Sequence, residues 1–165
     1  MIKQLLRYLG LAVLLFALQL LVFNNINFHG YVAPYIYPML LLVLPLSLKH
    51  WHLLVVGFAC GLLMDVFMHT LGLHATAMLI VAYLRPFVTP SDASRAYAPG
   101  MRMGFRWFLK YALVGIFVHH FVLFILEAFT FNNLSITLLR IVLSTIASTL
   151  FILILEAMRA SGSEK

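Results

Sequence analysis

The chain consists of long apolar runs separated by short polar segments, and this pattern predicts a membrane protein. A helix that crosses a membrane needs about 20 consecutive, predominantly apolar residues. On that scale the chain divides into six predicted spans, which make an all-α, polytopic membrane helix bundle. Residues 1–165 are predicted to form a single integral membrane domain. The spans cover approximately residues 5–23, 35–48, 53–68, 73–84, 107–129 and 136–158.

The predicted span over residues 35–48 is irregular, because Pro34, Pro38 and Pro45 lie in or beside it. Proline removes a backbone donor and kinks a helix. We therefore predict a short helix that bends at Pro45. In lipid, the carbonyl groups that proline frees must find partners on neighbouring helices.

The spans over residues 53–68 and 73–84 are short and lie close together in the sequence. They could form one re-entrant hairpin, but we favour two spans because the basic residues then fall on one side of the membrane. Arg85-Pro86 is expected to end the second of these helices. It opens a long polar segment, a predicted loop over residues 85–106 that contains proline, glycine and serine.

The lysine and arginine residues gather on one side of this arrangement. If the N-terminus lies in the cytoplasm, ten of the eleven lie on the cytoplasmic side, and Arg140 is the exception. Basic residues concentrate on that side in membrane proteins, so both termini are predicted to be cytoplasmic. The loop contributes Arg85, Arg95, Arg102 and Arg106. It either contacts cytoplasmic partners or anchors to anionic lipid, and the sequence leaves both interpretations open.

The composition excludes several classes of protein. Hydrophobic residues make up 64% of the chain and charged residues 10%, whereas a soluble domain is about 45–50% apolar and about 25% charged. This excludes an ordinary soluble domain, and the high hydrophobicity excludes a disordered chain. The single cysteine, Cys60, excludes an internal disulfide. The net charge of +6 is explained by loops that face anionic lipid, so we expect no nucleic-acid partner.

Asp65 is the most informative charged residue within a predicted span. An aspartate at mid-helix costs about 2.5–3.5 kcal/mol on insertion scales, so it must face other helices. Gly57, Gly61 and Asp65 recur every four residues and share one helix face, and a Gly-x-x-x-Gly pair lets another backbone approach closely. Either this face packs inside the protein, with Asp65 hydrogen-bonded to a neighbouring helix, or it docks a partner or a small ligand.

Two further pairs of charges are predicted from position. Glu127 lies near the end of one span and Arg140 near the start of the next, with a short turn between them. These helices are antiparallel neighbours, so we predict a Glu127–Arg140 ion pair that holds the hairpin together; binding of a partner is the less favoured role. Glu156 and Arg159 are three residues apart and are expected to pair locally.

The sequence provides little support for catalysis. The adjacent His119 and His120 point about 100° apart, so one helix face cannot present both. No His-Glu-x-x-His motif and no phosphate-binding glycine-rich loop occur. We therefore expect no enzyme activity, no metal site and no cofactor.

The third and fourth predicted spans resemble a known family. Residues 57–66 read Gly-Phe-Ala-Cys-Gly-Leu-Leu-Met-Asp-Val, residues 71–75 read Leu-Gly-Leu-His-Ala, and residues 82–84 read Ala-Tyr-Leu. This order of motifs resembles the signature of the MreD family of rod shape-determining proteins. The match is sharpest over about 30 residues, and the remainder agrees in size, number of spans and topology. On this resemblance, Gly72 joins Gly57, Gly61 and Asp65 as a helix-packing or partner-binding residue.

The resemblance implies a non-enzymatic function in bacterial cell-shape control. MreD-like proteins are multi-pass components of the cytoplasmic (inner) membrane and belong to the elongation machinery, or rod complex. They associate with the bitopic protein MreC and help to couple MreB filaments to the cell-wall synthases that make peptidoglycan. Their fold is similar to that of the substrate-binding subunits of energy-coupling-factor transporters. The long, basic loop over residues 85–106 departs from the family pattern.

That similarity of fold suggests an alternative function, as the substrate-binding membrane subunit of a transporter for a small, vitamin-type molecule. Such a subunit would need an outward-facing pocket, for which Asp65, His74 and His119 are candidates. An adjacent MreC gene would favour the scaffold, and adjacent transport ATPases would favour the transporter. The sequence leaves self-association and the stoichiometry with any partner open.

Overall fold

The computed structural model describes the chain except for residues 1, 27–29, 90–99, 101–102, 130–132 and 163–165. Within the described residues all regular secondary structure is helical, which confirms the predicted all-α class. The elements are α1 (Ile2–Leu21), the short 3-10 helix η1 (Phe23–Asn25), α2 (Met39–Val43), α3 (His50–Met68), α4 (Leu73–Val88), α5 (Phe105–Ala128) and α6 (Leu134–Gly162).

Several of these helices are long and apolar enough to cross a membrane. Four candidate spans cover Ile2–Asn25, His50–Met68, Phe105–Ala128 and Leu134–Ser161. Helix α4 is also apolar but has only 16 residues. These helices fit a multi-pass membrane protein, while the count of six spans and the orientation of the termini stay predictions.

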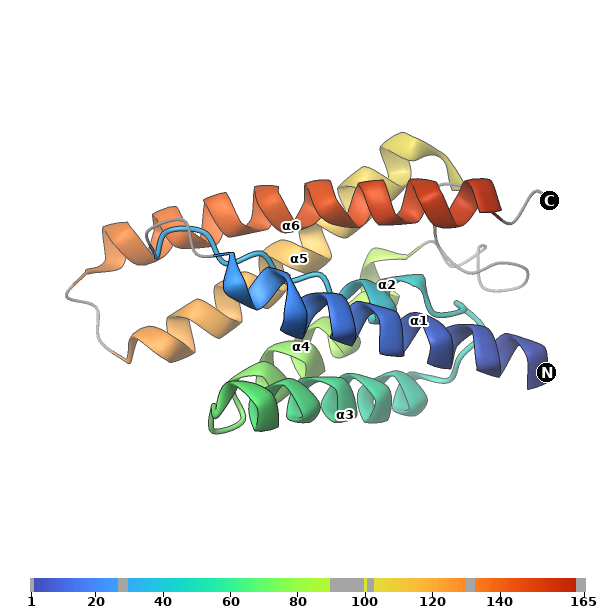
Figure 1. Cartoon of the computed structure of the whole chain (residues 1–165), viewed down its shortest axis with the longest axis horizontal. Helices are drawn as coiled ribbons and strands as arrows, with labels where there is room; N and C mark the ends of the chain where they lie inside the picture. The colour runs from blue at the N-terminus through green and yellow to red at the C-terminus, as the bar shows by residue number, and fades with distance from the viewer. Residues whose placement is uncertain (1, 27–29, 90–99, 101–102, 130–132, 163–165) are drawn as a thin grey trace.

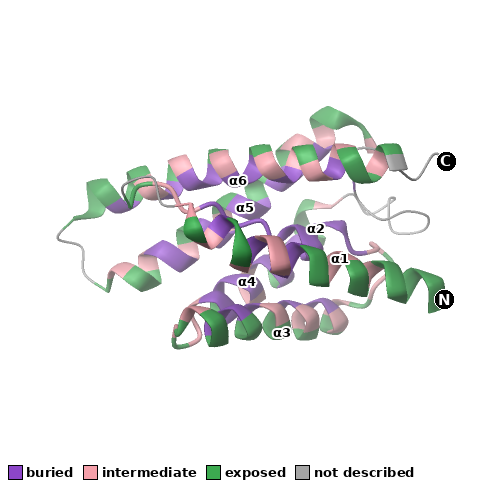
Figure 2. Cartoon of the chain, viewed as in Figure 1, coloured by how far each residue is buried: buried purple, intermediate pink, exposed green. Residues whose placement is uncertain are grey.

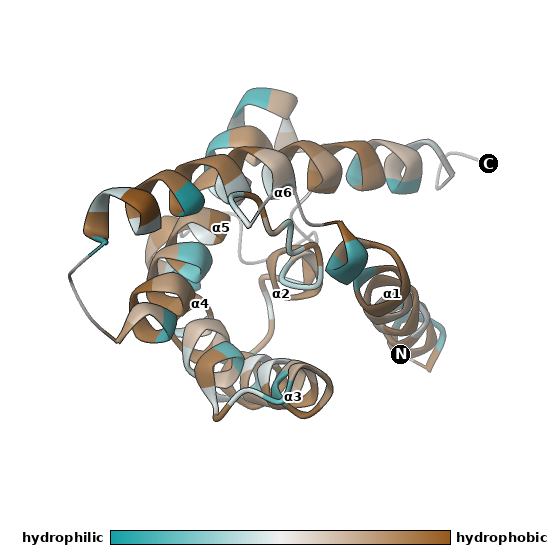
Figure 3. Cartoon of the chain, turned by 60° about the vertical axis from the view of Figure 1, so that its left-hand side comes forward, coloured by the Kyte–Doolittle hydropathy of each residue, from teal (hydrophilic) through white to brown (hydrophobic). Residues whose placement is uncertain are grey.

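The long helices surround α2. Figure 1 shows α5 and α6 as one long hairpin, α3 and α4 as a second hairpin, and α1 running across the front of the bundle. In the rotated view of Figure 3, α2 lies in the middle, with the other helices around it. Figure 2 shows that the purple, buried positions gather along this centre, whereas the outer faces of the helices are exposed.

The predicted span over residues 35–48 is wrong as a single bent helix, because only Met39–Val43 is helical. We call residues 31–48, which contain α2 and the non-helical chain on both sides, the central segment. Pro38 is the N-cap of α2, and Pro34 and Pro45 flank it. Proline cannot donate to a helix and drives the residue before it towards an extended conformation, so three prolines limit the helix to five residues.

The central segment nevertheless occupies the core. Apart from Pro38, its side chains from Tyr35 to Leu44 belong to the buried hydrophobic cluster of the bundle. Ile36, Tyr37 and Met39 have no exposed surface. Non-helical backbone at membrane depth is tolerated only where protein surrounds it, and the ring of helices in Figure 3 provides that protein.

The predicted end of the fourth span also needs correction. Helix α4 does not stop at Arg85-Pro86 but continues through Pro86 to Val88. Pro86 lies in the last turn, where its missing N–H removes only the bond to the carbonyl four residues earlier. Because α5 already begins at Phe105, the segment predicted as a loop over residues 85–106 is shortened at both ends.

Candidate functional site

The glycine face of α3 packs directly against α4. A Cβ atom added at Gly57 would lie 3.0 Å from the Cβ of Ala82 and 3.1 Å from the carbonyl oxygen of Met78. A Cβ at Gly61 would overlap the backbone of His74 and Ala75. The two helices therefore touch backbone to backbone, which is the close approach that a Gly-x-x-x-Gly pair permits.

Asp65 completes this face by capping the N-terminus of α4. Its Oδ1 atom accepts a hydrogen bond from the backbone N–H of His74 at 3.0 Å, and its Oδ2 atom accepts one from Ala75 at 2.9 Å. Thr70 donates its hydroxyl to Oδ1 at 2.5 Å. The first N–H groups of a helix have no partner within the helix, and its N-terminus attracts negative charge. The buried carboxylate thus provides acceptors for the free N–H groups at the start of α4, and those N–H groups stabilise its negative charge.

Gly72 shapes the turn that makes this cap possible. It is the N-cap of α4 and has a φ of +82°, a conformation that favours glycine. Lacking a side chain, it cannot cap the helix itself, so Asp65 of α3 takes that role. Gly57, Gly61, Asp65 and Gly72 are therefore brought together in one hairpin, and α4 covers the face that the first three of them form.

The central segment forms a second concentration of polar contacts. The backbone N–H of Ala33 donates to Ser144 Oγ at 3.0 Å, and that of Tyr35 donates to Ser148 Oγ at 2.8 Å. The side chain of Gln19 acts as both acceptor and donor. Its Oε1 accepts a hydrogen bond from Ile36 N at 2.7 Å, and its Nε2 donates one to Pro34 O at 3.2 Å. Side chains from α1 and α6 thus replace the hydrogen bonds that a helix would have made.

Histidines from α4 and α5 also reach the central segment. The Tyr37 hydroxyl oxygen lies 3.0 Å from His74 Nδ1 and 2.6 Å from His119 Nε2. His120 diverges from His119, with its Nδ1 2.9 Å from the carbonyl oxygen of Ile116 and its Nε2 3.3 Å from that of Ala33. Both adjacent histidines are fully buried, although Phe117 and Phe121 beside them on α5 are 43% exposed.

This histidine cluster has no arrangement that would hold a metal. Among the residues that the structure describes, no three His, Cys, Asp or Glu side chains come together in that way. One ring nitrogen of His74 and one of His119 already bond the hydroxyl of Tyr37. The hydrogen bond that Asp65 accepts from His74 comes from the backbone N–H rather than from the ring. The hydroxyl group of Tyr37 thus lies between two of the three residues that were candidates for a pocket.

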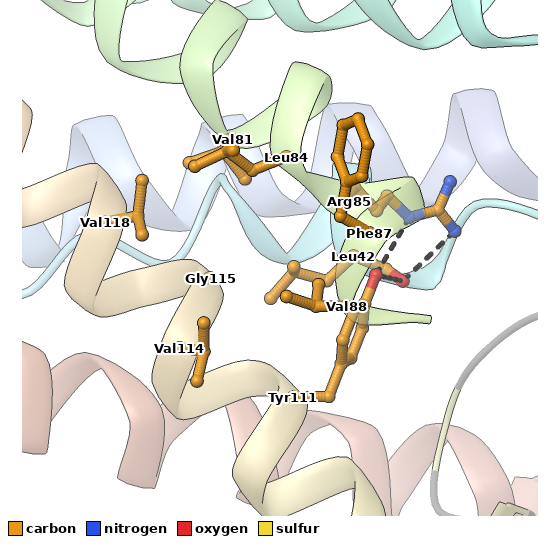
Figure 4. Close-up of a pocket in the computed structure, with 10 residues that line it drawn as sticks. All are labelled: Leu42, Val81, Leu84, Arg85, Phe87, Val88, Tyr111, Val114, Gly115 and Val118. Carbon is orange, nitrogen blue, oxygen red and sulfur yellow. Dashed lines mark hydrogen bonds between the residues drawn. The ribbon is translucent and has the colours of Figure 1, made fainter. Parts of the chain in front are cut away.

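Arg85 lies in the interior and not in a loop, which corrects the sequence prediction. Its side chain is 2% exposed. Its Nε donates to the Tyr111 hydroxyl at 2.8 Å, and its Nη2 donates to the carbonyl oxygens of Leu42, at 3.5 Å, and Leu44. Tyr111 donates in turn to Leu42 O at 3.1 Å (Figure 4). The carbonyl groups at the end of α2 thus find partners on α4 and α5, as the prolines led us to expect.

The other charged residues form a mixed set, in which Glu156 is buried while Glu127, Arg140 and Arg159 are partly exposed. Arg140 Nη2 is 3.4 Å from Glu127 Oε2, so the predicted ion pair is present, and Arg140 also lies 4.6 Å from the centre of the Phe124 ring. Glu156 accepts two hydrogen bonds from Arg159, at 2.6 and 2.7 Å. Arg106 is exposed in the first turn of α5. Arg95 and Arg102 lie outside the described residues.

Comparison of the chain with protein-family models, with curated proteins and with solved structures gives no match. The contacts described above therefore carry the functional argument. Sequence reasoning missed Gln19, Ser144 and Ser148, although a polar residue inside an apolar run is a visible signal. Ser144 and Ser148 stand four residues apart and share one face of α6.

Proposed function

We propose that the protein is a non-enzymatic scaffold of the MreD type in the cytoplasmic membrane of a rod-shaped bacterium. In this proposal it binds MreC and helps to link MreB filaments to the peptidoglycan synthases, and so contributes to cell shape. The resemblance over residues 57–84 supports it, because the residues that carry the resemblance form one structural unit, the α3–α4 hairpin.

The observation that carries the proposal is the way this hairpin divides α3 into two faces. The inner face, with Gly57 and Gly61, is locked against α4. The exposed side of α3 carries large apolar side chains, among them a stripe formed by Val55, Phe58, Leu62 and Val66. Helix association in lipid depends on close packing of preformed surfaces. A helix that is fixed from behind loses little freedom when a partner helix docks in front.

The interior of the bundle supports a scaffold over a transport subunit. His74 and His119 are bonded to Tyr37, and Asp65 is bonded to the start of α4. The polar residues that would line a substrate pocket are thus used to hold the protein's own central segment. The outer face of α3 is therefore the better candidate for binding, and a single membrane-crossing helix such as that of MreC is a suitable partner.

Co-purification from membranes tests this proposal. The tagged protein is expected to retain MreC in mild detergent, and the double variant Phe58→Ala/Leu62→Ala is expected to retain much less. A matched control is Phe117→Ala/Leu150→Ala, which removes side chains of the same types and similar exposure from α5 and α6. The control is expected to retain MreC at the level of the unaltered protein.

Three outcomes would contradict the proposal. One is failure of MreC to co-purify at all, and another is equal loss in both double variants. The third is a small molecule that stays bound through purification while MreC is absent, which would favour the transport subunit. In cells, depletion of the protein is expected to turn rods into spheres.

A further inference from the structure

A lateral groove lies between α4 and α5, separate from the outer face of α3 (Figure 4). Its walls are apolar, with Val81 and Leu84 from α4 facing Val114 and Val118 from α5, and Leu42 of the central segment lies against it as well. Leu84 and Val114 are exposed, 37% and 45% respectively, so the groove opens sideways from the bundle. The space within the groove that water can reach is about 100 Å³, less than the range of about 300–1,000 Å³ that is typical of small-molecule sites, so the groove is narrow.

The positive charge of Arg85 lies at one end of this groove (Figure 4). Its guanidinium bonds only a phenol and two carbonyl groups, and among the described residues no carboxylate pairs with it. Its Nη1 is buried and has no hydrogen-bond partner among the residues that the structure describes. A buried charge is expensive unless an opposite charge compensates it. The end of the groove therefore has an uncompensated positive potential.

Two exposed basic residues continue the α5 wall towards the start of that helix. Lys110 lies four residues before Val114, and Arg106 lies four residues before Lys110, so both follow the ridge that forms the wall. Neither makes an ion pair with a described residue. Near the end of a membrane helix, long basic side chains extend towards the lipid headgroups. The groove thus combines an apolar channel with a basic end.

We propose that this groove binds an anionic phospholipid, with one acyl chain between α4 and α5 and the phosphate against Lys110 and Arg106. The apolar walls match a hydrocarbon chain. The basic end matches a negative headgroup, as in the basic pockets between helices that bind such lipids. A neutral phospholipid would fill the channel equally well but would leave the positive charges uncompensated. The site is independent of the proposed contact with MreC.

Native mass spectrometry of the purified protein tests this inference. The protein is mixed with phosphatidylglycerol or with phosphatidylcholine that carries the same acyl chains. We expect the anionic lipid to be retained preferentially. Each basic side chain near a membrane surface contributes about fivefold to binding of anionic lipid. Lys110→Gln and Arg106→Gln are therefore each expected to weaken phosphatidylglycerol binding about fivefold, with no change for phosphatidylcholine.

A filling variant tests the channel itself. Val114→Phe places a bulky ring in the groove and is expected to abolish retention of both lipids. Val142→Phe is the matched control, because Val142 is an exposed valine of α6, 48% exposed against 45% for Val114. The control is expected to bind like the unaltered protein, and the exposed Gln variants keep the test informative if the filling variant fails to fold.

Either of two results would overturn the inference. One is that the protein retains the anionic and the neutral lipid equally, and that Lys110→Gln, Arg106→Gln, Val114→Phe and Val142→Phe all leave this retention unchanged. The other is a Val114→Phe protein that keeps its lipid but loses a membrane-crossing protein partner, because the groove would then be a protein interface.

Discussion

The α3–α4 hairpin and the central segment both place polar groups in the apolar interior, but they satisfy them in different ways. In the hairpin, the carboxylate of Asp65 bonds N–H groups only 9 and 10 residues away. In the central segment, backbone groups bond side chains as far as 111 and 113 residues away. The hairpin is therefore held by local contacts, whereas the central segment needs the assembled bundle.

This difference indicates how each region responds to change. The hairpin depends on the absence of side chains, since two backbones meet at Gly61. The central segment depends on the presence of particular side chains, because in lipid a backbone group without a partner costs several kcal/mol. Adding atoms should damage the first region, and removing polar atoms should damage the second.

The largest effect is expected from Gly61→Val. The added side chain would overlap the backbone of His74 and Ala75, which cannot move as a flexible side chain can. The helices must separate, and the cap on α4 is lost with them, so the free energy of unfolding should fall by more than about 3 kcal/mol. Thermal unfolding in detergent measures this.

Gly10→Val is the control for that change, because a Cβ atom at Gly10 meets nothing within 4 Å. It should leave the unfolding temperature almost unchanged. Similar losses in both variants would mean that the close approach of α3 and α4 does not stabilise the protein.

A smaller effect is expected from Gln19→Leu, which tests the central segment. The change keeps the volume but leaves the N–H of Ile36 and the carbonyl of Pro34 without their partner. A buried polar group that loses its partner costs about 1–3 kcal/mol, and thermal unfolding should detect that loss. Gln4→Leu, on the exposed part of the same helix, is the matched control. Equal stability of both variants would contradict the role assigned to Gln19.

The smallest effect is expected from Glu127→Gln, outside both regions. The Glu127 and Arg140 side chains are 47% and 29% exposed, and pairs of exposed charges contribute about 0–1 kcal/mol. Unfolding in detergent should therefore shift by less than about 1 kcal/mol. A loss as large as that of Gly61→Val would show that the α5–α6 hairpin depends on its ion pair as strongly as the α3–α4 hairpin depends on its close approach.

The same contrast explains what could be predicted from the sequence. The spacing of Gly57, Gly61 and Asp65 places them on one helix face by local geometry alone, and their burial in the structure follows from it. The Glu127–Arg140 ion pair could also be predicted from the sequence, because only a short turn separates the two helices. In both cases the sequence contains the partners within one hairpin.

The central segment could be anticipated only in part. Its three prolines indicated a broken helix and carbonyl groups in need of partners. They did not indicate that Gln19, Ser144 and Ser148 would supply other bonds, since sequence spacing does not show which distant helices meet. Arg85 was assigned to a loop because it precedes a proline, whereas its bonds to the Leu42 and Leu44 carbonyl groups hold it inside.

The central claim is that the hairpin holds α3 so that its outer face binds MreC, and crosslinking in intact membranes tests it most directly. A photo-reactive amino acid replaces Phe58 on α3 or, as the reference position, Leu150 on α6, both of which are exposed. The account predicts a crosslink to the membrane helix of MreC from position 58 and none from position 150. A crosslink from position 150 alone, or from neither position in membranes that contain MreC, would contradict it.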